Sequence, residues 1–352
     1  MISSEQPLKN RIRNYRVARG WSQEELARRS GVSRAGISAI EIERLAPSAA
    51  AALALAAVFD CRVEDLFCLG SFTADAPAWA WPPTADPCRF WQAEVGGTTW
   101  LYPAEATSAG ALPHDGLWHA GQCRHDGPWA AGDTLVVACC DPAASLLAAE
   151  FARTSTYRML VLPRSSREAL DLLGQGRVHV AGVHLAASTS TGGNAETVRD
   201  RLGAGYSILR AACWEEGVAI APKLHVRSVR AALRGKLRWV GRQPGSGAQQ
   251  CLDELLGNRP SPRHVARDHR SVADAIRTGW ADAGVCLRLV SEEQGLDFLS
   301  VRQEAYELCF PATMSSDPRV RALLAVVRSA SYRRMLAELP GYDSSQTGEF
   351  SS

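Results

Sequence analysis

Apolar positions in the first 70 residues recur every three or four residues and stop at turn residues, which is the spacing of short amphipathic helices. The first clear helix opens at Ser22, which can act as its N-cap, and Glu25 three residues later completes a capping box. The pattern stops at Gly31, where a positive φ is easiest to adopt, and restarts after a second cap, Ser33. Two short helices joined by a tight turn are therefore predicted.

From residue 131 onward, short apolar runs alternate with amphipathic stretches. Strands are predicted over 134–140, 157–163, 178–185, 237–243, 263–268, 281–287 and 297–302. Helices are predicted over 143–154, 165–174, 246–256, 271–279 and 317–338. This alternation predicts parallel sheets covered by helices on both faces. The extended segments 207–222 and 299–311 predict two lobes with a double crossover over a domain at 131–343, followed by a flexible tail at 344–352.

The connector at 71–130 is predicted to be a linker that contains a β-hairpin. Its first part is rich in Pro, Ala and Trp, and two β-rich runs at 89–95 and 98–102 flank a Gly-Gly pair. Three histidines and a cysteine follow, but their spacing matches no standard metal site. We therefore predict no metal and no other cofactor.

Charge is distributed unevenly along the chain. Residues 8–44 hold nine basic and four acidic residues, whereas the whole chain has a net charge of only +2. A basic end on a near-neutral body is typical of a nucleic-acid-binding head. The first ten residues lack the apolar core of a signal peptide, and no stretch approaches 18 apolar residues, so a cytoplasmic protein without a membrane span is expected.

The N-terminal 70 residues resemble a helix-turn-helix of the lambda-repressor/Cro or XRE type. The resemblance is carried by "WSQEELARRSGVSRAGISAIE" and "RLAPSAAAALALAAVFDCRVEDLF". It implies an all-α head, a DNA-binding domain at 1–70 built as a five-helix bundle, with the alanine-rich helix 48–59 in its core. By position it implies candidates for contact with base edges, namely Ser33, Arg34, Ser38 and Ala39. The candidates for contact with phosphate are Gln23, Arg34 and Arg44.

The C-terminal domain resembles the type II periplasmic-binding-protein-like fold, an α/β two-lobed architecture, in the molybdate-binding-protein-like form found behind helix-turn-helix heads. The resembling segments are "LVVACCDPAASLLA", "VHVAGVHL", "WEEGVAIAP", "RWVGRQPGSGAQ", "ADAGVCL" and "GYDSSQTG". The resemblance implies a ligand held between two lobes that close by hinge bending. Where relatives tend to read GSGTR, this chain has GSGAQ at 245–249, which argues against molybdate or tungstate.

The ends of the predicted strands point to the same cleft, because ligands of open α/β sheets bind beyond the carboxyl ends of strands, where helix N-termini point. A Gly-Ser-Gly loop that opens a helix would suit an oxyanion. The candidate ligand-binding residues are Asp141, Ser145, His184, Arg242, Gln243, Ser246, Gly247, His269, Ser271 and Tyr306. Asp141 would repel an anion unless it is turned away or hydrogen-bonded.

The ten cysteines include no CxxC pair and are expected to be reduced thiols. Cys139 and Cys140 follow each other at the end of one predicted strand, and Cys286 lies at the end of another. Buried small hydrophobic residues are one interpretation. The alternative is a thiol sensor of a soft metal, a metalloid or a reactive sulfur species.

Together these patterns predict a ligand-responsive DNA-binding transcriptional regulator. It is expected to bind double-stranded operator DNA as a homodimer or higher homo-oligomer, with a small, anionic ligand changing that binding. A solute receptor for a transporter is the less favoured alternative. A cysteine-dependent enzyme is not expected, because no Cys–His pair with a third orienting group can be read from the sequence.

Overall fold

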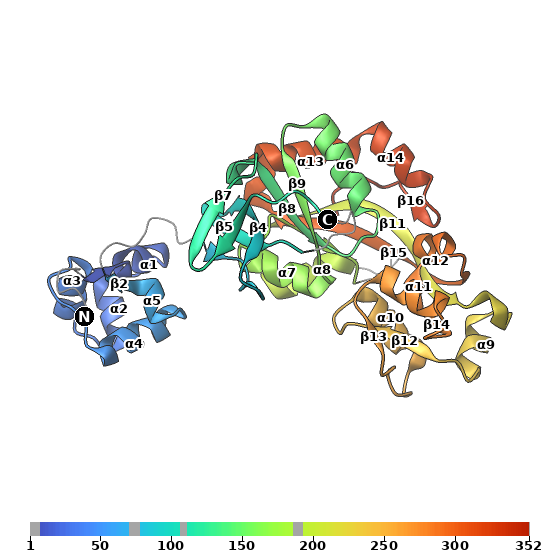
Figure 1. Cartoon of the computed structure of the whole chain (residues 1–352), viewed down its shortest axis with the longest axis horizontal. Coiled ribbons are helices and arrows are strands. Elements are labelled where there is room, and N and C mark those ends of the chain that lie inside the picture. The colour runs from blue at the N-terminus through green and yellow to red at the C-terminus, as the bar shows by residue number, and fades with distance from the viewer. Residues whose placement is uncertain (1–7, 70–77, 106–110, 186–192, 352) are drawn as a thin grey trace. The chain divides into compact units, whose positions relative to one another are not determined.

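The computed structural model describes residues 8–69, 78–105, 111–185 and 193–351. Contacts divide the chain into two compact units, Met1–Ala78 and Trp79–Ser352, and each unit has hydrophobic cores of its own (Figure 1). No helix in the described ranges is long and apolar enough to cross a membrane.

The first unit is a bundle of five short helices, as the sequence predicted. Its elements are β1 (Leu8–Asn10), α1 (Ile12–Ala18), α2 (Gln23–Ser30), α3 (Arg34–Glu41), α4 (Ala49–Phe59), α5 (Val63–Leu66) and β2 (Phe67–Leu69). The antiparallel pair formed by β1 and β2 was not predicted. Ile37 and Ile40 hold α3 in the core, where Leu66 and Phe67 are also buried.

Local signals in the sequence explain where α2 and α3 begin and end. The hydroxyl of Ser22 accepts the backbone N–H of Glu25, and that of Ser33 accepts the N–H of Gly36. Gly31 ends α2 with a φ of 72°. The predicted capping box is not formed: the Glu25 carboxylate accepts hydrogen bonds from Arg28 and Arg29 instead, one turn along the helix.

The second unit begins with a five-stranded antiparallel sheet, where the sequence predicted a linker with one hairpin. The strand order is β3 (Ala78–Trp79), β5 (Thr98–Pro103), β4 (Cys88–Val95), β6 (Gly116–His119) and β7 (Gln122–His125). The predicted hairpin is the pair β4 and β5. This sheet shares a core with the following domain through Trp91 and Tyr102, and a buried ion pair joins Asp115 to Arg158.

The rest of the second unit contains a mixed sheet flanked by helices. Its strands are β8 (Thr134–Cys139), β9 (Arg158–Pro163), β10 (Val180–Val183), β11 (Tyr206–Ile220), β12 (Trp239–Arg242), β13 (Val265–Ala266), β14 (Ala283–Leu287), β15 (Asp297–Pro311) and β16 (Tyr342–Asp343). Its helices are α6 (Ala144–Thr154), α7 (Ser166–Gly174), α8 (Gly193–Leu202), α9 (Val229–Arg234), α10 (Gly247–Leu256), α11 (His269–Arg277), α12 (Arg288–Glu293), α13 (Pro318–Arg328) and α14 (Ala330–Ala337). Helices α8, α9 and α12 were not predicted, and the helix expected at 317–338 is divided near Ser329, which caps α14.

Two lobes meet along the long antiparallel pair of β11 and β15. The first lobe contains the parallel strands β9, β8 and β10, and the second contains β13, β12 and β14. Both long strands run through both lobes, and their register shifts between Glu216 and Gly217. They occupy the extended segments that the sequence predicted as the double crossover, so the two-lobed fold is confirmed.

Parallel strands buried on both faces explain the continuous apolar runs of the sequence. In β8, alternate residues face two different cores: Leu135 and Val137 pack with α6 and α13, whereas Val136 and Ala138 pack with α7. The carboxyl ends of β8 and β12 each lead to the N-terminus of the next helix, α6 and α10 respectively.

Candidate functional site

A cavity of about 350 Å³ lies between the two lobes, beyond the carboxyl ends of the parallel strands. Residues at or near the carboxyl ends of β8 and β9 line one side, and residues at or near those of β12 and β13 line the other. Of the predicted residues, those that line it are Cys139, Cys140, Asp141, Arg242, Gln243 and His269. Its volume is within the range of pockets that hold small molecules.

Arg242 and His269 are the two buried bases of this cavity. Their exposed fractions are 3% and 1%, yet Nε and Nη1 of Arg242 and both ring nitrogens of His269 have no hydrogen-bond partner among the described residues. Only Nη2 of Arg242 donates, to the carbonyl of Arg267 at 3.4 Å. Burial and the neighbouring charge of Arg242 lower the pKa of His269 well below its ordinary value, so its imidazole is neutral. Unpaired donors in such a position are costly unless a ligand satisfies them.

The carboxylates around the cavity, by contrast, have partners within the protein. Asp141 accepts the hydroxyl of Tyr342 at 2.6 Å and the N–H of Ala143 at 2.8 Å. Glu168 accepts the N–H and hydroxyl of Ser165. Because Asp141 is hydrogen-bonded in this way, its repulsion of a bound anion is weaker than that of a free carboxylate. Burial also raises the pKa of its carboxyl group.

A third carboxylate at the cavity, that of Asp268, is also hydrogen-bonded within the protein. It caps α11 and accepts both the N–H and the hydroxyl of Ser271, at 2.7 and 2.8 Å. Ser271, which was predicted from the sequence to bind ligand, does not line the cavity. Ser145 lies on α6 and does not line it either.

The Gly-Ser-Gly loop serves the fold rather than the cavity, which corrects the sequence prediction. The hydroxyl of Ser246 accepts the N–H of Gln249 and donates to the carbonyl of Gln243, so it caps α10. Gly247 lies against His184, where an added Cβ would be 2.3 Å from the His184 carbonyl oxygen. Neither residue lines the cavity.

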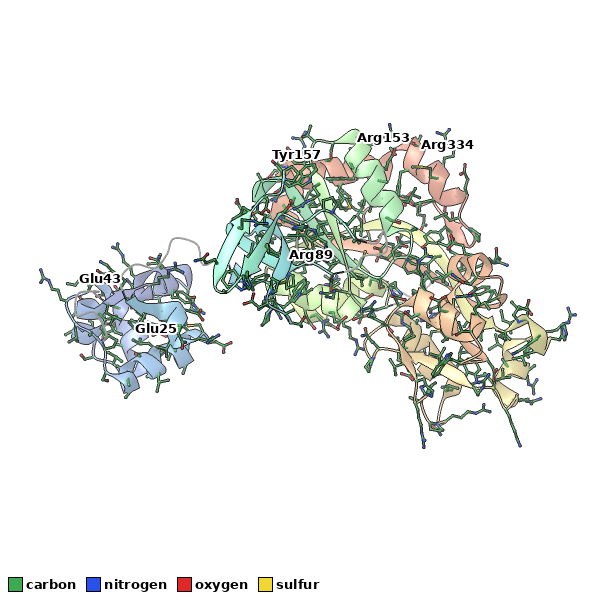
Figure 2. All side chains as sticks on the ribbon, viewed as in Figure 1. Glu25, Glu43, Arg89, Arg153, Tyr157 and Arg334 are labelled. Carbon is green, nitrogen blue, oxygen red and sulfur yellow. The ribbon has the colours of Figure 1, made fainter. Side chains whose placement is uncertain are left out.

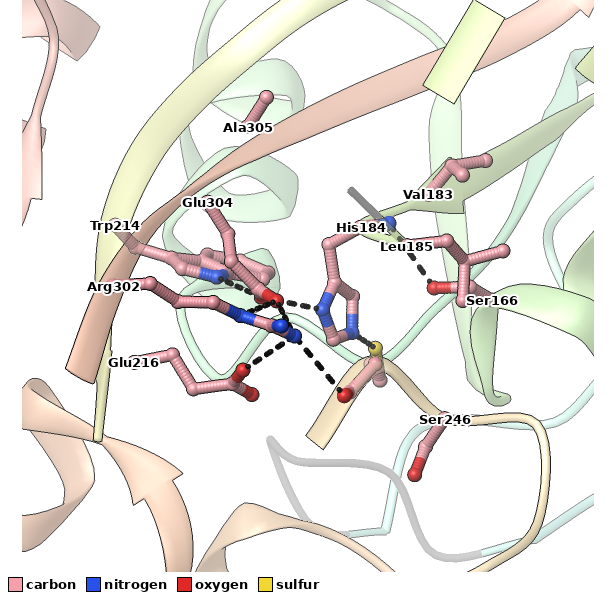
Figure 3. Close-up of polar contacts among 12 residues, drawn as sticks. Ser166, Val183, His184, Leu185, Trp214, Glu216, Ser246, Arg302, Glu304 and Ala305 are labelled. Atoms are coloured by element: carbon pink, nitrogen blue, oxygen red, sulfur yellow. Dashed lines mark hydrogen bonds and ion pairs between the residues drawn. The ribbon is translucent and has the colours of Figure 1, made fainter. Parts of the chain in front are cut away.

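His184 lies behind the cavity wall and belongs to a hydrogen-bonded chain of three side chains. Its Nε2 is 2.9 Å from Sγ of Cys140, and its Nδ1 is 3.0 Å from Oε2 of Glu304 (Figure 3). Trp214 donates from Nε1 to the same Glu304 oxygen and packs edge-on against the imidazole. Burial alone would lower the pKa of His184, but Cys140 and Glu304 raise it well above its ordinary value. Tyr306, also predicted to bind ligand, is buried and stacks on Trp214.

His184, Glu216 and Glu304 lie close enough together to hold a metal ion, but one arginine, Arg302, already forms ion pairs with both carboxylates. Nη2 of Arg302 lies 2.6 Å from Glu304 and 3.1 Å from Glu216 (Figure 3). A cation placed there would be repelled by the guanidinium. The arrangement is better described as a buried ion network that spans the long strands.

The three predicted sensor cysteines have different surroundings. Burial raises the pKa of both Cys139 and Cys286 to about 12, which disfavours the reactive thiolate. Cys140 is partly exposed, lines the cavity and contacts an imidazole. The structure therefore separates Cys140 from the other two.

The predicted DNA-contacting residues lie on or near α3 of the first unit. Ser33, Arg34 and Arg44 are exposed, and Ser38 and Ala39 are partly exposed. Gln23 differs, because its amide donates to Glu41 at 2.8 Å, and Arg16 forms a bidentate ion pair with the same carboxylate. Gln23 thus helps to hold α2, α1 and α3 together, and a phosphate contact would require it to change partners.

The sequence did not identify several residues of the cleft. The cavity is also lined by Pro142, Val161, Pro163, Arg164, Ser165, Glu168, Arg267, Asp268 and Arg270. The Ser-x-x-Glu pattern at 165–168 and the Asp-x-x-Ser pattern at 268–271 are helix-start signals that point to this edge of the sheet. Glu304 had no local signal, because it reaches His184 from a strand 120 residues later.

Comparisons with known proteins agree with both units. A family model described as PBP superfamily domain matches residues 148–328, about half of the chain, and one described as Helix-turn-helix matches residues 12–66. An HTH-type transcriptional regulator of Archaeoglobus fulgidus is 43% identical over 60 residues, which are 17% of this chain and 86% of that protein.

Two further similarities each cover more than half of the chain. YvgK of Bacillus subtilis is 25% identical over 197 residues, 53% of this chain and 63% of YvgK, so less than two thirds of that relative is covered. The structure of PhnD1 from Prochlorococcus marinus in complex with methylphosphonate has a TM-score of 0.43 at 12% identity, over 61% of this chain and 94% of that one. The chain belongs to the PBP superfamily and has at its N-terminus a helix-turn-helix domain of the kind found in HTH-type transcriptional regulators.

Proposed function

We propose that this protein is a cytoplasmic transcriptional regulator whose binding to operator DNA responds to a small anionic ligand held between the two lobes. The anionic class of the ligand is inferred from two bases in the cavity, Arg242 and His269, which have side-chain nitrogens that no described residue occupies. The proposed role is binding and signalling rather than turnover.

Electrostatics favour an anion with more than one acceptor oxygen. Arg242 has donors at Nε and Nη1 that no described residue occupies; they lie on different edges of the guanidinium, so each can meet a separate acceptor oxygen. The neutral imidazole of His269 supplies one further N–H, and α11 begins at His269, so the positive end of its dipole also favours negative charge. The three nearby carboxylates do not compete for these donors, because each is already hydrogen-bonded.

Lobe closure is the proposed means by which the ligand acts. Cys140 and Asp141 follow β8 of the first lobe, whereas in the second lobe Arg242 ends β12 and His269 begins α11. A ligand that contacts both sides is bound more tightly when the lobes are closed, and it therefore shifts the population toward that state. In a dimer with two heads on a two-fold operator, such a shift would change DNA affinity.

The test compares the full-length protein with an Arg242→Gln variant and with Arg153→Gln as a matched control. Arg153 lies on α6, pairs with Glu150 and does not line the cavity (Figure 2). Inorganic phosphate, sulfate and molybdate, and small carboxylates such as acetate and citrate, are each titrated calorimetrically. Operator DNA is first selected from a random library, and its affinity is measured with and without the bound anion.

We expect at least one anion to bind the wild-type and Arg153→Gln proteins and to change their DNA affinity. Arg242→Gln should weaken anion binding about tenfold or more, while DNA affinity without the anion stays unchanged. The salt dependence of DNA binding should have a log–log slope of about −0.9 per contacted phosphate. DNA binding that shows no dependence on salt, or equal anion binding by both variants, would overturn the proposal.

A further inference from the structure

Cys140 combines two properties in the described part of the chain: it lines the cavity and its sulfur contacts a histidine that is itself oriented by a carboxylate. Its Sγ lies 2.9 Å from Nε2 of His184, whose Nδ1 lies 3.0 Å from Glu304. A thiol, an imidazole and a carboxylate in this order form the arrangement that activates sulfur nucleophiles. The three residues come from the ends of β8 and β10 and from β15, which are far apart in sequence.

His184 is held in one orientation and can accept the thiol proton. Glu304 fixes its Nδ1, the Trp214 ring packs against it with a centroid distance of 4.9 Å, and its backbone N–H donates to Ser166 (Figure 3). The remaining charges nearby are Arg302 and Glu216 on the long strands and Asp141 on the cavity side. Nε2 is therefore left facing Cys140.

The same cavity holds the unpartnered nitrogens of Arg242 and His269, which is an independent sign that a ligand occupies it. We propose that Cys140 is a nucleophile that forms a thioether with a small anionic electrophile, a carboxylate bearing an electrophilic carbon, whose charge is held by Arg242. This proposal rests on the anion site of the proposed function and adds to it the chemical class of one ligand and a covalent step.

The step is an alkylation of sulfur, and it requires no external oxidant or reductant. The Cys140 sulfur donates an electron pair to the electrophilic carbon, and the thiol proton passes to Nε2 of His184. With a haloacetate, the carbon–halogen bond breaks and the halide leaves with its electron pair. With a conjugated unsaturated acid, the π electrons move to the carbon beside the carbonyl, which then takes the proton from His184.

Formation of the adduct would change hydrogen bonds along the long strands, because His184 is linked through them to the second lobe. Glu304 binds Arg302, and Arg302 reaches Glu254 on α10 at 2.8 Å and the carbonyl of Gly247. Once Cys140 is alkylated, its thiol proton is gone and its sulfur is a poorer partner for His184. The hydrogen bonds along this path then change at the point where the lobes meet.

Iodoacetate is the anionic probe, iodoacetamide is its neutral counterpart, and Cys123 is an internal control. Cys123 lies 3.3 Å from Nε2 of His125 on the antiparallel sheet, and it lines neither the cavity nor the lobe boundary. Labelling of the full-length protein at pH 7 is followed at each cysteine by peptide mass spectrometry. We expect iodoacetate to modify Cys140 about tenfold or more faster than Cys123.

The arginine variants test whether charge directs the reagent. The ratio of iodoacetate to iodoacetamide rates should be about tenfold higher at Cys140 than at Cys123 in the wild type. Arg242→Gln should abolish this preference and Arg153→Gln should retain it, while the ratio at Cys123 stays the same in all three proteins. This comparison needs no change within the Cys–His–Glu chain.

His184→Gln tests the proton acceptor. We expect the Cys140 rate to fall about tenfold while the rate at Cys123 is retained, measured at a temperature at which the variant is folded. If that variant does not fold, the wild-type and arginine comparisons still decide the matter. Equal rates at Cys140 and Cys123, or an anion preference unaffected by Arg242→Gln, would overturn the proposal. If anions bind reversibly through Arg242 but Cys140 is not selectively alkylated, this inference fails and the proposed function stands.

Discussion

Gly247 shows how closely the second lobe approaches His184. A Cβ at this position would lie 2.3 Å from the His184 carbonyl oxygen and 2.6 Å from its Nδ1. The space is filled by backbone and by a fully buried ring, neither of which can move aside cheaply. The glycine is thus required by packing between the lobes and not by contact with a ligand.

We expect Gly247→Ala to lower the free energy of unfolding of the second unit by about 1–3 kcal/mol, because the added methyl group overpacks this contact. Gly132→Ala is the matched control, since a Cβ there meets no atom within 4 Å. Urea titration followed by tryptophan fluorescence measures both. Equal stability of the two variants would show that the lobes are not packed here as described.

His179 joins the five-stranded sheet to the first lobe through both ring nitrogens. Its Nδ1 accepts the N–H of Val136 at 2.9 Å, and its Nε2 donates to the carbonyl of Glu94 at 2.8 Å, so only the neutral ring fits. Burial, together with the charge of Arg319, lowers its pKa to about 4.

The lowered pKa gives a pH prediction with a definite sign. The unfolded state binds the proton more readily than the folded state, so stability present above pH 6.5 is lost as the pH falls toward 4. At about 1.4 kcal/mol per pKa unit, the loss from His179 is about 3 kcal/mol. In His179→Gln, the free energy of unfolding of the second unit should fall less over this pH range. A decline as steep as that of the wild type would contradict the assignment.

At the scale of elements, the helix starts were the part of the fold most accessible from sequence. Ser22, Ser33 and Ser246 are all N-caps, because their side chains satisfy local backbone N–H groups and so depend on residues within three positions. For the same reason, Ser246 was misjudged as a ligand residue: a serine before a helix suits a cap and an oxyanion equally well by sequence. Short helices such as α9 and α12 were missed because each has only six residues and little periodicity.

Ser22→Ala tests the cap of α2. We expect it to lower the free energy of unfolding of the first unit by about 1 kcal/mol, because the N–H of Glu25 loses its acceptor. Ser38→Ala is the control, since it lies within α3 and replaces serine by the best helix former. Thermal unfolding of residues 1–78 by circular dichroism measures both. A Ser22→Ala protein as stable as the wild type would show that the cap contributes little.

At the scale of the molecule, the two units have separate cores and are expected to unfold separately. Differential scanning calorimetry of the full chain should resolve two transitions, and an anion bound in the cavity should raise only the one that belongs to residues 79–352. Fragments 1–78 and 79–352 identify each transition. A single transition that shifts as a whole with the anion would show that the two units unfold as one.

The sequence by itself determined the helix-turn-helix head, the alternation of strands and helices, and the edge of the sheet at which the cavity lies. These features follow from hydrophobic periodicity and from capping residues, which act over a few positions. Of the residues predicted in this way, Arg242, His269, Asp141 and Cys140 line the cavity.

Only the tertiary structure decided what each of those residues does. Whether these polar groups are free or hydrogen-bonded depends on parts of the chain that are far away in sequence: Tyr342, 201 residues later, donates to Asp141, and no described side chain accepts from Nε or Nη1 of Arg242. The link from Cys140 through His184 to Glu304 joins segments 44 and 120 residues apart. Periodicity carries no information over such separations, so the chemistry of the cleft is set by the packing of the two lobes.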